Sequence, residues 1–436
     1  MARVFPLILL WVISTLTVSC FHEPWRDEAQ AWLVARYSPN LTELLFRASI
    51  EATGPFYYLL LWPFARSFPH GFPTFHFFIS WVGTALAVWT LLGMKRLPWV
   101  LRILVAFGYL LGFEYACVAR LYGWGTFFLF QGISADLEGN KKRSLGWFSL
   151  CLLVQLNFVF AVFAWVLARG AQRFLPLFIP LGLHLALLHW TNQVGSTEVW
   201  HFSTTLTKLG STLMAPLVQM PGSMGLAGLV AFPLGMWVLS MKDRIAFGCA
   251  MIPFSALFLF RYFGHPQSRH AGALAMIWVV LVGLAWKKLS ERKRQAALVL
   301  LALSFIGGLL GRGQDIFYPY SDGLAIAKQI QAESSQANEP PWLVTDYPYA
   351  GVVVAAILDL PLWFKGERIG RPFGPTNTVK SSELCPSGFS CYFIGDKPVA
   401  ETMFASLGNW KLLRERSKWA IASETLYLYR RVPTSF

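Results

Sequence analysis

Two neighbouring carboxylates, Asp27 and Glu28, follow the first apolar segment of the chain within the stretch FHEPWRDEAQAWLVAR, and Arg26 precedes them. A carboxylate at the edge of a membrane is partly desolvated, which raises its pKa toward the range useful for a general base. The alternative is a solvated first turn of a helix, where acidic residues are favoured. We predict that Asp27 is the catalytic base, that Glu28 is the second catalytic candidate, and that Arg26 contacts substrate.

Two arginine-containing segments could bind an anionic group. Arg120 and Tyr122 lie in ARLYGWGTFFLF, and Arg269 and His270 lie in GHPQSRHAG. Arginine binds a phosphate through two parallel hydrogen bonds, which makes it suited to a departing phosphate. The alternative for each arginine is anchoring at the membrane surface by a long side chain. All four residues are candidates for substrate binding.

Two weaker candidates complete the set of polar residues. His201, in EVWHFSTT, is a further substrate-binding candidate, although a lone histidine near a membrane surface is more often structural. Glu114 lies at the predicted end of a span and could pair with Arg120. No phosphate-binding loop, zinc-ligand spacing or serine-nucleophile motif is present, so no resident cofactor or metal is predicted, and a divalent cation is kept as an alternative. Cys385 and Cys391 could form a disulfide if the C-terminal part lies outside the cytoplasm.

The composition indicates that membrane-spanning helices position these residues. Hydrophobic residues make up 55% of the chain and charged residues only 14%, too few to coat a soluble protein of 436 residues. A net charge of +14 suggests nucleic-acid binding at first sight. The basic residues, however, stand in short clusters between apolar segments, which is the positive-inside pattern of membrane proteins. We therefore predict no nucleic-acid partner.

The apolar segments predict about eleven spans, because a bilayer core requires about 20 apolar helical residues. The segment 145–167 is either one span, with a second across 204–220, or two short spans broken near Gln155 and Asn157. Both alternatives place the N-terminus in the cytoplasm and the C-terminus outside it. The predicted spans are about 5–21, 74–92, 99–114, 122–136, 145–167, 174–190, 224–241, 245–260, 271–286 and 295–310.

Two domains follow from this pattern: a transmembrane domain at 1–312, whose first outside loop is 22–73, and a small extracytoplasmic α/β domain at 313–436. Within the loop, 54–66 is too short to span and is expected to be a helix at the membrane surface. In the tail, polar residues return and no spanning run remains. Strands are predicted at 342–346, 391–395 and 425–429, with a helix at 350–358.

The order of these motifs resembles the GT-C glycosyltransferases, among them the protein O-mannosyltransferases and the aminoarabinose transferases of lipid A. The matching residues are WRDEA in the first outside loop with the later PFYYLLL, the ARLY segment, and the Arg269-His270 loop. The resemblance implies that Asp27 is catalytic. One departure is that relatives often carry His-Pro-Pro before the Leu-Tyr-Tyr run, where this chain has Thr53, Gly54 and Pro55.

The resemblance also implies an activity and a location. The expected reaction is inverting transfer of a sugar from a polyprenyl-phosphate donor to a hydroxyl or amine of a glycan, lipid or protein acceptor. It would take place on the extracytoplasmic face of a bacterial inner membrane, among membrane lipids. A transporter or flippase of lipid-linked glycans is the alternative. The predicted spans are nearly free of charge, and the candidate residues gather at one face, which favours surface chemistry over a transport path.

Overall fold

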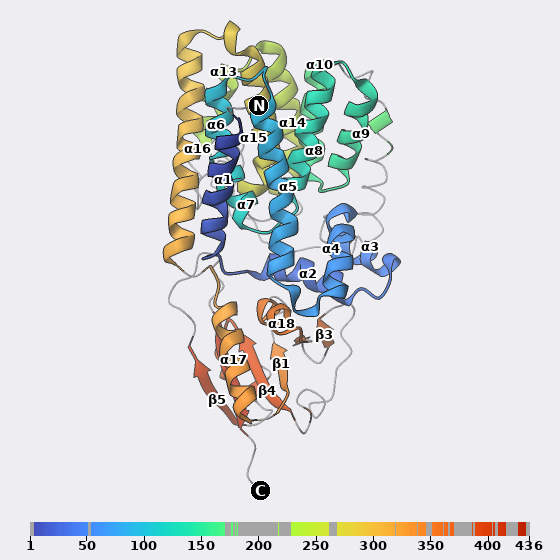
Figure 1. Cartoon of the computed structure of the whole chain (residues 1–436), viewed down its shortest axis with the longest axis vertical. Coiled ribbons are helices and arrows are strands. Elements are labelled where there is room, and N and C mark those ends of the chain that lie inside the picture. The colour runs from blue at the N-terminus through green and yellow to red at the C-terminus, as the bar shows by residue number, and fades with distance from the viewer. Residues whose placement is uncertain are drawn as a thin grey trace. The chain divides into compact units, whose positions relative to one another are not determined.

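The computed structural model (Figure 1) is mostly helical, with strands in the C-terminal part of the described chain. By the density of their contacts the residues form two compact units. The first, here the span unit, comprises 1–20, 49–57 and 79–313, and the second, here the loop unit, comprises 21–48, 58–78 and 314–436. The structure describes residues 4–50, 54–170, 176–177, 179, 181, 217, 228–260, 268–318, 320–337, 339–345, 351–360, 362–364, 367–369, 386, 389–402, 404–405, 409–415 and 426–432.

The span unit is a set of apolar helices that run in roughly parallel or antiparallel directions (Figure 1). Apolar side chains occur on all sides of these helices, as expected where both neighbouring helices and lipid are apolar. The helices are α1 (Val4–Ser19), α5 (Thr74–Gly93), α6 (Trp99–Ala106), α7 (Tyr115–Cys117), α8 (Tyr122–Leu137), α9 (Lys141–Leu152), α10 (Asn157–Arg169), α13 (Gly228–Val238), α14 (Met241–Phe260), α15 (Ser268–Ala285) and α16 (Glu291–Phe317).

The described helices agree with the predicted spans where both exist. Three stretches, Thr74–Gly93, Arg269–Lys288 and Glu291–Phe317, are long and apolar enough to cross a membrane, and a bent pair of helices makes a fourth. Helices α1 and α10 are apolar but shorter. The total of about eleven spans stays a prediction, because most of 174–190 and nearly all of 204–220 lie outside the described residues.

The ambiguous segment 145–167 forms two helices, α9 and α10, which are separated by a break at residues 153–156. Arg169 at the end of α10 pairs with Asp136 at the end of α8, with 3.4 Å between Nε and Oδ2. Since α9 begins just after Asp136, the end of α10 lies beside the start of α9, and the two helices form a hairpin. The described residues therefore favour the two-helix alternative, in which Lys141 and Arg169 share one side.

The predicted span 99–114 is one bent segment rather than a straight helix. Helix α6 and the stretch Leu110–Cys117 meet at 46°, and Leu110–Glu114 is a π-helical turn. Such a turn frees backbone carbonyl groups, which cannot stay unpaired in a membrane. The buried guanidinium of Arg312 donates to the carbonyls of Gly112 (2.9 Å) and Phe107 (3.1 Å) and to Ser14 Oγ (3.0 Å). Arg312 therefore stabilises the bend.

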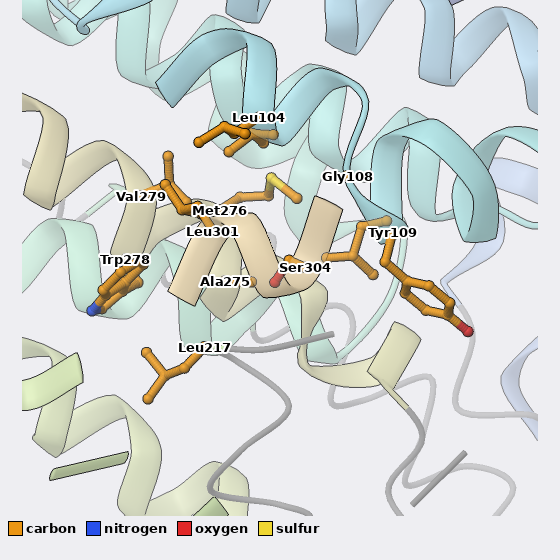
Figure 2. Close-up of a pocket in the computed structure, with 12 residues that line it drawn as sticks. Leu104, Gly108, Tyr109, Leu217, Ala275, Met276, Trp278, Val279, Leu301 and Ser304 are labelled. Atoms are coloured by element: carbon orange, nitrogen blue, oxygen red, sulfur yellow. The ribbon is translucent and has the colours of Figure 1, made fainter. Parts of the chain in front are cut away.

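Glycine is required at position 112, because a Cβ there would meet Nη2 of Arg312 and lie only 2.7 Å from the backbone carbonyl oxygen of Phe107. A small cavity of about 20 Å³ lies on the other side of the bend, roughly the space that one water molecule needs. Figure 2 shows that Gly108 and Tyr109 border it, together with residues of α15 and α16 such as Met276 and Ser304. The cavity therefore lies between the bend and residues of α15 and α16.

Replacing Arg312 with Met is expected to lower the unfolding temperature in detergent clearly. Each backbone acceptor left without a donor costs about 1–3 kcal/mol, and two carbonyls lose their partner in this variant. The matched control is Arg292→Met on the same helix, because Arg292 is exposed. Equal unfolding temperatures for the two variants would contradict the stabilising role of Arg312.

The loop unit begins with three short helices, α2 (Arg26–Tyr37), most of α3 (Leu41–Ile50) and all but the start of α4 (Pro55–Ser67). The helix expected at 54–66 is therefore present as α4. Two side chains of α4 close the turn between α2 and α3: Trp62 Nε1 donates to the carbonyl of Ser38 (3.1 Å), and Arg66 donates to that of Pro39 (2.7 Å). These bonds hold the turn that connects α2 to α3.

The C-terminal residues of the loop unit form a six-stranded mixed sheet in the order β3-β2-β1-β4-β6-β5. Strand β1 pairs in parallel with β2 and with β4, and the other pairs are antiparallel. Helix α17 (Gly323–Ala337) precedes β1, and α18 (Val352–Leu358) connects β1 to β2. The strands are β1 (Pro341–Thr345), β2 (Leu362–Phe364), β3 (Glu367–Ile369), β4 (Ser390–Gly395), β5 (Asn409–Arg414) and β6 (Tyr427–Val432).

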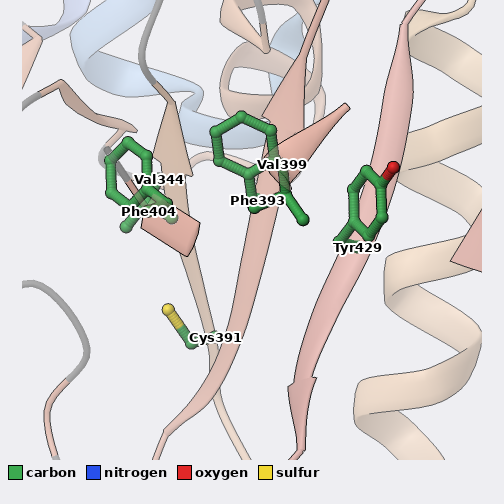
Figure 3. Packing of buried hydrophobic residues seen from close by; sticks show 6 residues of the cluster. All are labelled: Val344, Cys391, Phe393, Val399, Phe404 and Tyr429. Atoms are coloured by element: carbon green, nitrogen blue, oxygen red, sulfur yellow. The ribbon is translucent and has the colours of Figure 1, made fainter. Parts of the chain in front are cut away.

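One face of this sheet carries a cluster of buried apolar residues (Figure 3). Val344 of β1, Phe393 of β4 and Tyr429 of β6 share the face because side chains alternate along a strand. Cys391 also belongs to the cluster and is disulfide-bonded. Its predicted partner, Cys385, lies outside the described residues. The strands and the helix predicted from sequence correspond to β1, β4, β6 and α18, so an α/β arrangement of the C-terminal part is confirmed.

Candidate active site

The two neighbouring carboxylates, both in the first turn of α2, have different environments. Glu28, at its third position, accepts a hydrogen bond from the backbone N–H of Trp25 (2.9 Å), which is the carboxylate half of a capping box. Its side chain is 2% exposed. The Asp27 side chain is 21% exposed, and its Oδ1 lies 3.5 Å from Nε of Arg26. Asp27 is therefore accessible from solvent, whereas Glu28 is buried as a cap.

A histidine that the sequence did not single out lies next to this cap. His22 Nε2 is 3.3 Å from Glu28 Oε2, and His22 Nδ1 is 2.9 Å from Asp315 Oδ2. Burial lowers the pKa of His22, but the charges of Asp315 and Glu28 and their hydrogen bonds raise it more, so that its pKa is well above the ordinary 6.5. The two carboxylates therefore favour the protonated imidazole, which bridges them.

The far end of α2 has its own ion pair. Arg36 binds Asp359 through two parallel hydrogen bonds, Nε to Oδ1 at 3.0 Å and Nη2 to Oδ2 at 3.1 Å. Asp359 lies just after α18 in a left-handed conformation, with φ at 51°. This contact joins residues 323 positions apart. Helix α2 is therefore fixed at both ends by residues of the C-terminal part.

A second polar group lies in the span unit, around Arg269. This Arg269 cluster is built on an ion pair: Arg269 Nη1 is 3.7 Å from Glu114 Oε1, and both side chains are 7% exposed. Tyr109 donates to the other oxygen of Glu114 (2.8 Å), and Tyr115 donates to the carbonyl of Arg269 (2.7 Å). The cluster consists of Tyr109, Glu114, Tyr115, Tyr122, Arg269 and His270.

Aromatic contacts complete the Arg269 cluster. The rings of Tyr115 and Tyr122 stack with centroids 5.1 Å apart, and the ring of His270 meets Tyr122 edge-on at 6.3 Å. Gln155, in the break between α9 and α10, donates to the Tyr122 hydroxyl (3.3 Å). Buried polar residues inside membrane-spanning segments are costly and usually mark function. The cluster combines a buried guanidinium, paired with Glu114, with several hydroxyl groups.

The structure brings together three of the predicted binding residues, Tyr122, Arg269 and His270. The backbone carbonyl of Arg120 accepts a hydrogen bond from Ser80, and the Arg120 residue is partly exposed. Glu114, which was expected to pair with Arg120, forms an ion pair with Arg269. His201 lies outside the described residues. Within the described part of the chain, no group of three His, Cys, Asp or Glu residues could hold a metal ion.

Sequence reasoning missed Asp315, Asp359 and the two tyrosines Tyr109 and Tyr115. The aspartates are about 300 residues from their partners in the chain, so no local pattern connects them. For the tyrosines a signal existed, because they flank Glu114, an ionisable residue within an apolar segment. Such a residue indicates polar partners nearby.

No protein-family model and no curated protein sequence matches this chain. Among solved structures, the chain is similar to the crystal structure of ArnT from Cupriavidus metallidurans in the apo state. The two share 13% sequence identity and a TM-score of 0.52, and the likeness covers 98% of each chain. ArnT is an aminoarabinose transferase of the GT-C class. The chain therefore has a GT-C-like fold, that of a membrane protein with several spans.

Proposed function

We propose that this protein is an inverting glycosyltransferase that moves a sugar from a polyprenyl-phosphate donor to a hydroxyl or amine of an acceptor. The observation that carries the proposal is the likeness to ArnT over 98% of both chains. Fold alone does not define a function. The proposal therefore also rests on two polar clusters of suitable chemistry, one around Asp27 and one around Arg269.

The reaction requires a base and a cation. The acceptor oxygen or nitrogen attacks the anomeric carbon while the bond from that carbon to the phosphate oxygen breaks, and the phosphate leaves with the electron pair. Asp27 removes the proton of the acceptor, because its carboxylate is the more exposed of the two neighbours. Arg269 stabilises the phosphate, because a guanidinium binds phosphate through two hydrogen bonds.

The location follows from the same proposal. The apolar helices and the GT-C-like fold support a membrane location. We assign it to a bacterial inner membrane, with the N-terminus in the cytoplasm and the loop unit outside it. The basic clusters between the spans support this orientation. The phosphosugar of a polyprenyl donor lies at headgroup level, where an outside loop that begins at the end of a span can reach it.

The test is transfer of labelled sugar from synthetic polyprenyl phosphosugars by the purified full-length protein in nanodiscs. A panel of sugars is combined with extracted envelope glycans, lipids and proteins as acceptors. We expect labelled acceptor and free polyprenyl phosphate in equal amounts. Movement of the intact donor across a liposome membrane, with no transfer under any combination, would instead identify a transporter of lipid-linked glycans.

A further inference from the structure

The cluster at the start of α2 contains more charge than a helix cap requires. Glu28 already accepts a backbone hydrogen bond from Trp25, and Asp315 is buried at the end of α16, with 0% of its side chain exposed. His22 lies between the two carboxylates and contacts both oxygens of Asp315, at 3.1 and 2.9 Å. Two buried carboxylates with no cation between them would be strongly unfavourable. The imidazolium is their shared counter-charge.

This bridge acts on the residue proposed as the base. Glu28 fixes the first turn of α2 through its bond to Trp25, and Asp27 is the preceding residue in that turn. We propose that His22 and Asp315 are positioning residues for Asp27: the imidazolium of His22, oriented by Asp315, holds Glu28 on the helix cap and thereby fixes the direction of the Asp27 side chain. The inference rests on the proposed function of Asp27.

The described groups around His22 are mainly acidic and aromatic. Burial raises the pKa of Glu23, the next residue in the chain, whereas the nearby charge of Lys328 lowers it. The ring of Tyr320 meets the imidazole edge-on at 4.7 Å. Asp322 accepts a hydrogen bond from the backbone N–H of Leu426 at 2.9 Å, and its negative charge also raises the pKa of Glu23. The surroundings are therefore mainly acidic and aromatic, and His22 is the cationic group that contacts both Glu28 and Asp315.

The bridge gives the activity a defined dependence on pH. Because the pKa of His22 is higher in the folded state than the ordinary 6.5, its contribution to stability is complete at low pH. The contribution is lost as the pH rises through the folded pKa, where His22 becomes neutral and Glu28 and Asp315 repel each other. We therefore expect the rate of transfer to fall at alkaline pH, together with the order of the first turn of α2.

Asp315→Asn tests this directly. Removing one of the two carboxylates lowers the pKa of His22, so the alkaline fall in kcat should move to lower pH by about 1 unit or more. At neutral pH we expect kcat to decrease about tenfold, while the KM for the donor changes by less than about twofold, because the base is misdirected rather than removed. A purely structural Asp315 would lower activity equally at every pH, and that result would overturn the proposal.

A second readout does not require transfer. Hydrogen–deuterium exchange of the segment 22–37, corrected for the intrinsic effect of pH, should increase at alkaline pH in the wild type and at lower pH in Asp315→Asn. If the wild type shows this increase but transfers no sugar, the proposed function fails and the bridge stands. If transfer occurs but neither profile moves in the variant, the bridge is wrong. If Asp315→Asn does not fold, His22→Gln is the second test variant. We expect it to have low activity and to lack the alkaline fall in kcat that deprotonation of His22 causes.

The matched control lies at the other end of the same helix. Asp359→Asn disrupts the two hydrogen bonds with Arg36 and leaves His22, Glu28 and Asp315 unchanged. It should lower the unfolding temperature without shifting the alkaline fall in kcat. A shift of the same size in this control would mean that any loosening of α2 produces the effect, and would overturn the specific role of His22.

Discussion

Asp27→Asn is expected to reduce the rate of sugar transfer by at least about 100-fold, because a general base typically contributes about 10²- to 10⁴-fold. Asparagine keeps the shape of the side chain and cannot accept the proton of the acceptor. The variant should bind the donor as tightly as the wild type, since the donor lacks the proton in question. The measurement is the initial rate of transfer at saturating donor and acceptor in nanodiscs.

The fold should tolerate this change. The Asp27 side chain is partly exposed, and its ion pair with Arg26 at 3.5 Å contributes little at a partly exposed position. The unfolding temperature should therefore stay within a degree or two of the wild-type value, a small effect for a surface substitution. Glu43→Gln is the matched control in the same loop, because it removes a carboxylate that pairs with Arg47 at 2.9 Å in α3 and should leave transfer unchanged.

Glu28→Gln distinguishes the two neighbouring carboxylates. Glu28 is a buried cap in contact with His22 and Trp25, so its amide variant should lose stability along with activity. If Glu28→Gln were folded and inactive while Asp27→Asn stayed active, Glu28 would be the base. If both variants transferred sugar at the wild-type rate, the catalytic role of this loop would be wrong.

The sequence allowed prediction of the parts of the fold that depend on composition. Spans such as Thr74–Gly93 and Glu291–Phe317 are recognisable because each contains an apolar stretch long enough to cross the hydrocarbon core. The bend at residues 107–110 was not predicted, because its cause lies elsewhere in the chain: Arg312 on α16 supplies the hydrogen bonds that a π-helical turn lacks. Hydropathy records length and apolarity, and both are the same for a straight and a bent segment.

The same distinction applies to the candidate site. Asp27 and Glu28 could be selected from sequence, because a charged pair after an apolar segment is a local signal. The different environments of these two carboxylates could not be predicted. Glu28 contacts His22, and His22 pairs with Asp315, which is 293 residues away in the chain. The short strands β2, β3 and β5 were also missed. Their runs of three to six residues are defined by pairing with neighbours rather than by a strong pattern of their own.

Arg269→Lys is expected to raise the KM for the donor on the order of tenfold, with little change in the KM for the acceptor. Lysine keeps the positive charge but lacks the planar fork that binds two phosphate oxygens. A hydrogen bond to a charged group contributes about 1.5–3 kcal/mol, which corresponds to roughly 10- to 100-fold in affinity. Glu114 and Tyr115 hold Arg269 through its side chain and its carbonyl, so the lysine ammonium would enter a site shaped for a guanidinium.

The control is Arg102→Lys, in the same unit of the structure. Arg102 packs on the ring of Trp99 at 4.4 Å and donates to the carbonyl of Leu92, so it makes the contacts expected of an arginine that anchors a helix end. Its lysine variant should keep the wild-type KM for the donor. The two variants are compared by titrating the polyprenyl phosphosugar at fixed acceptor and then the acceptor at fixed donor. Equal donor KM values for both variants would assign Arg269 to anchoring as well, because a phosphate ligand must distinguish a guanidinium from an ammonium.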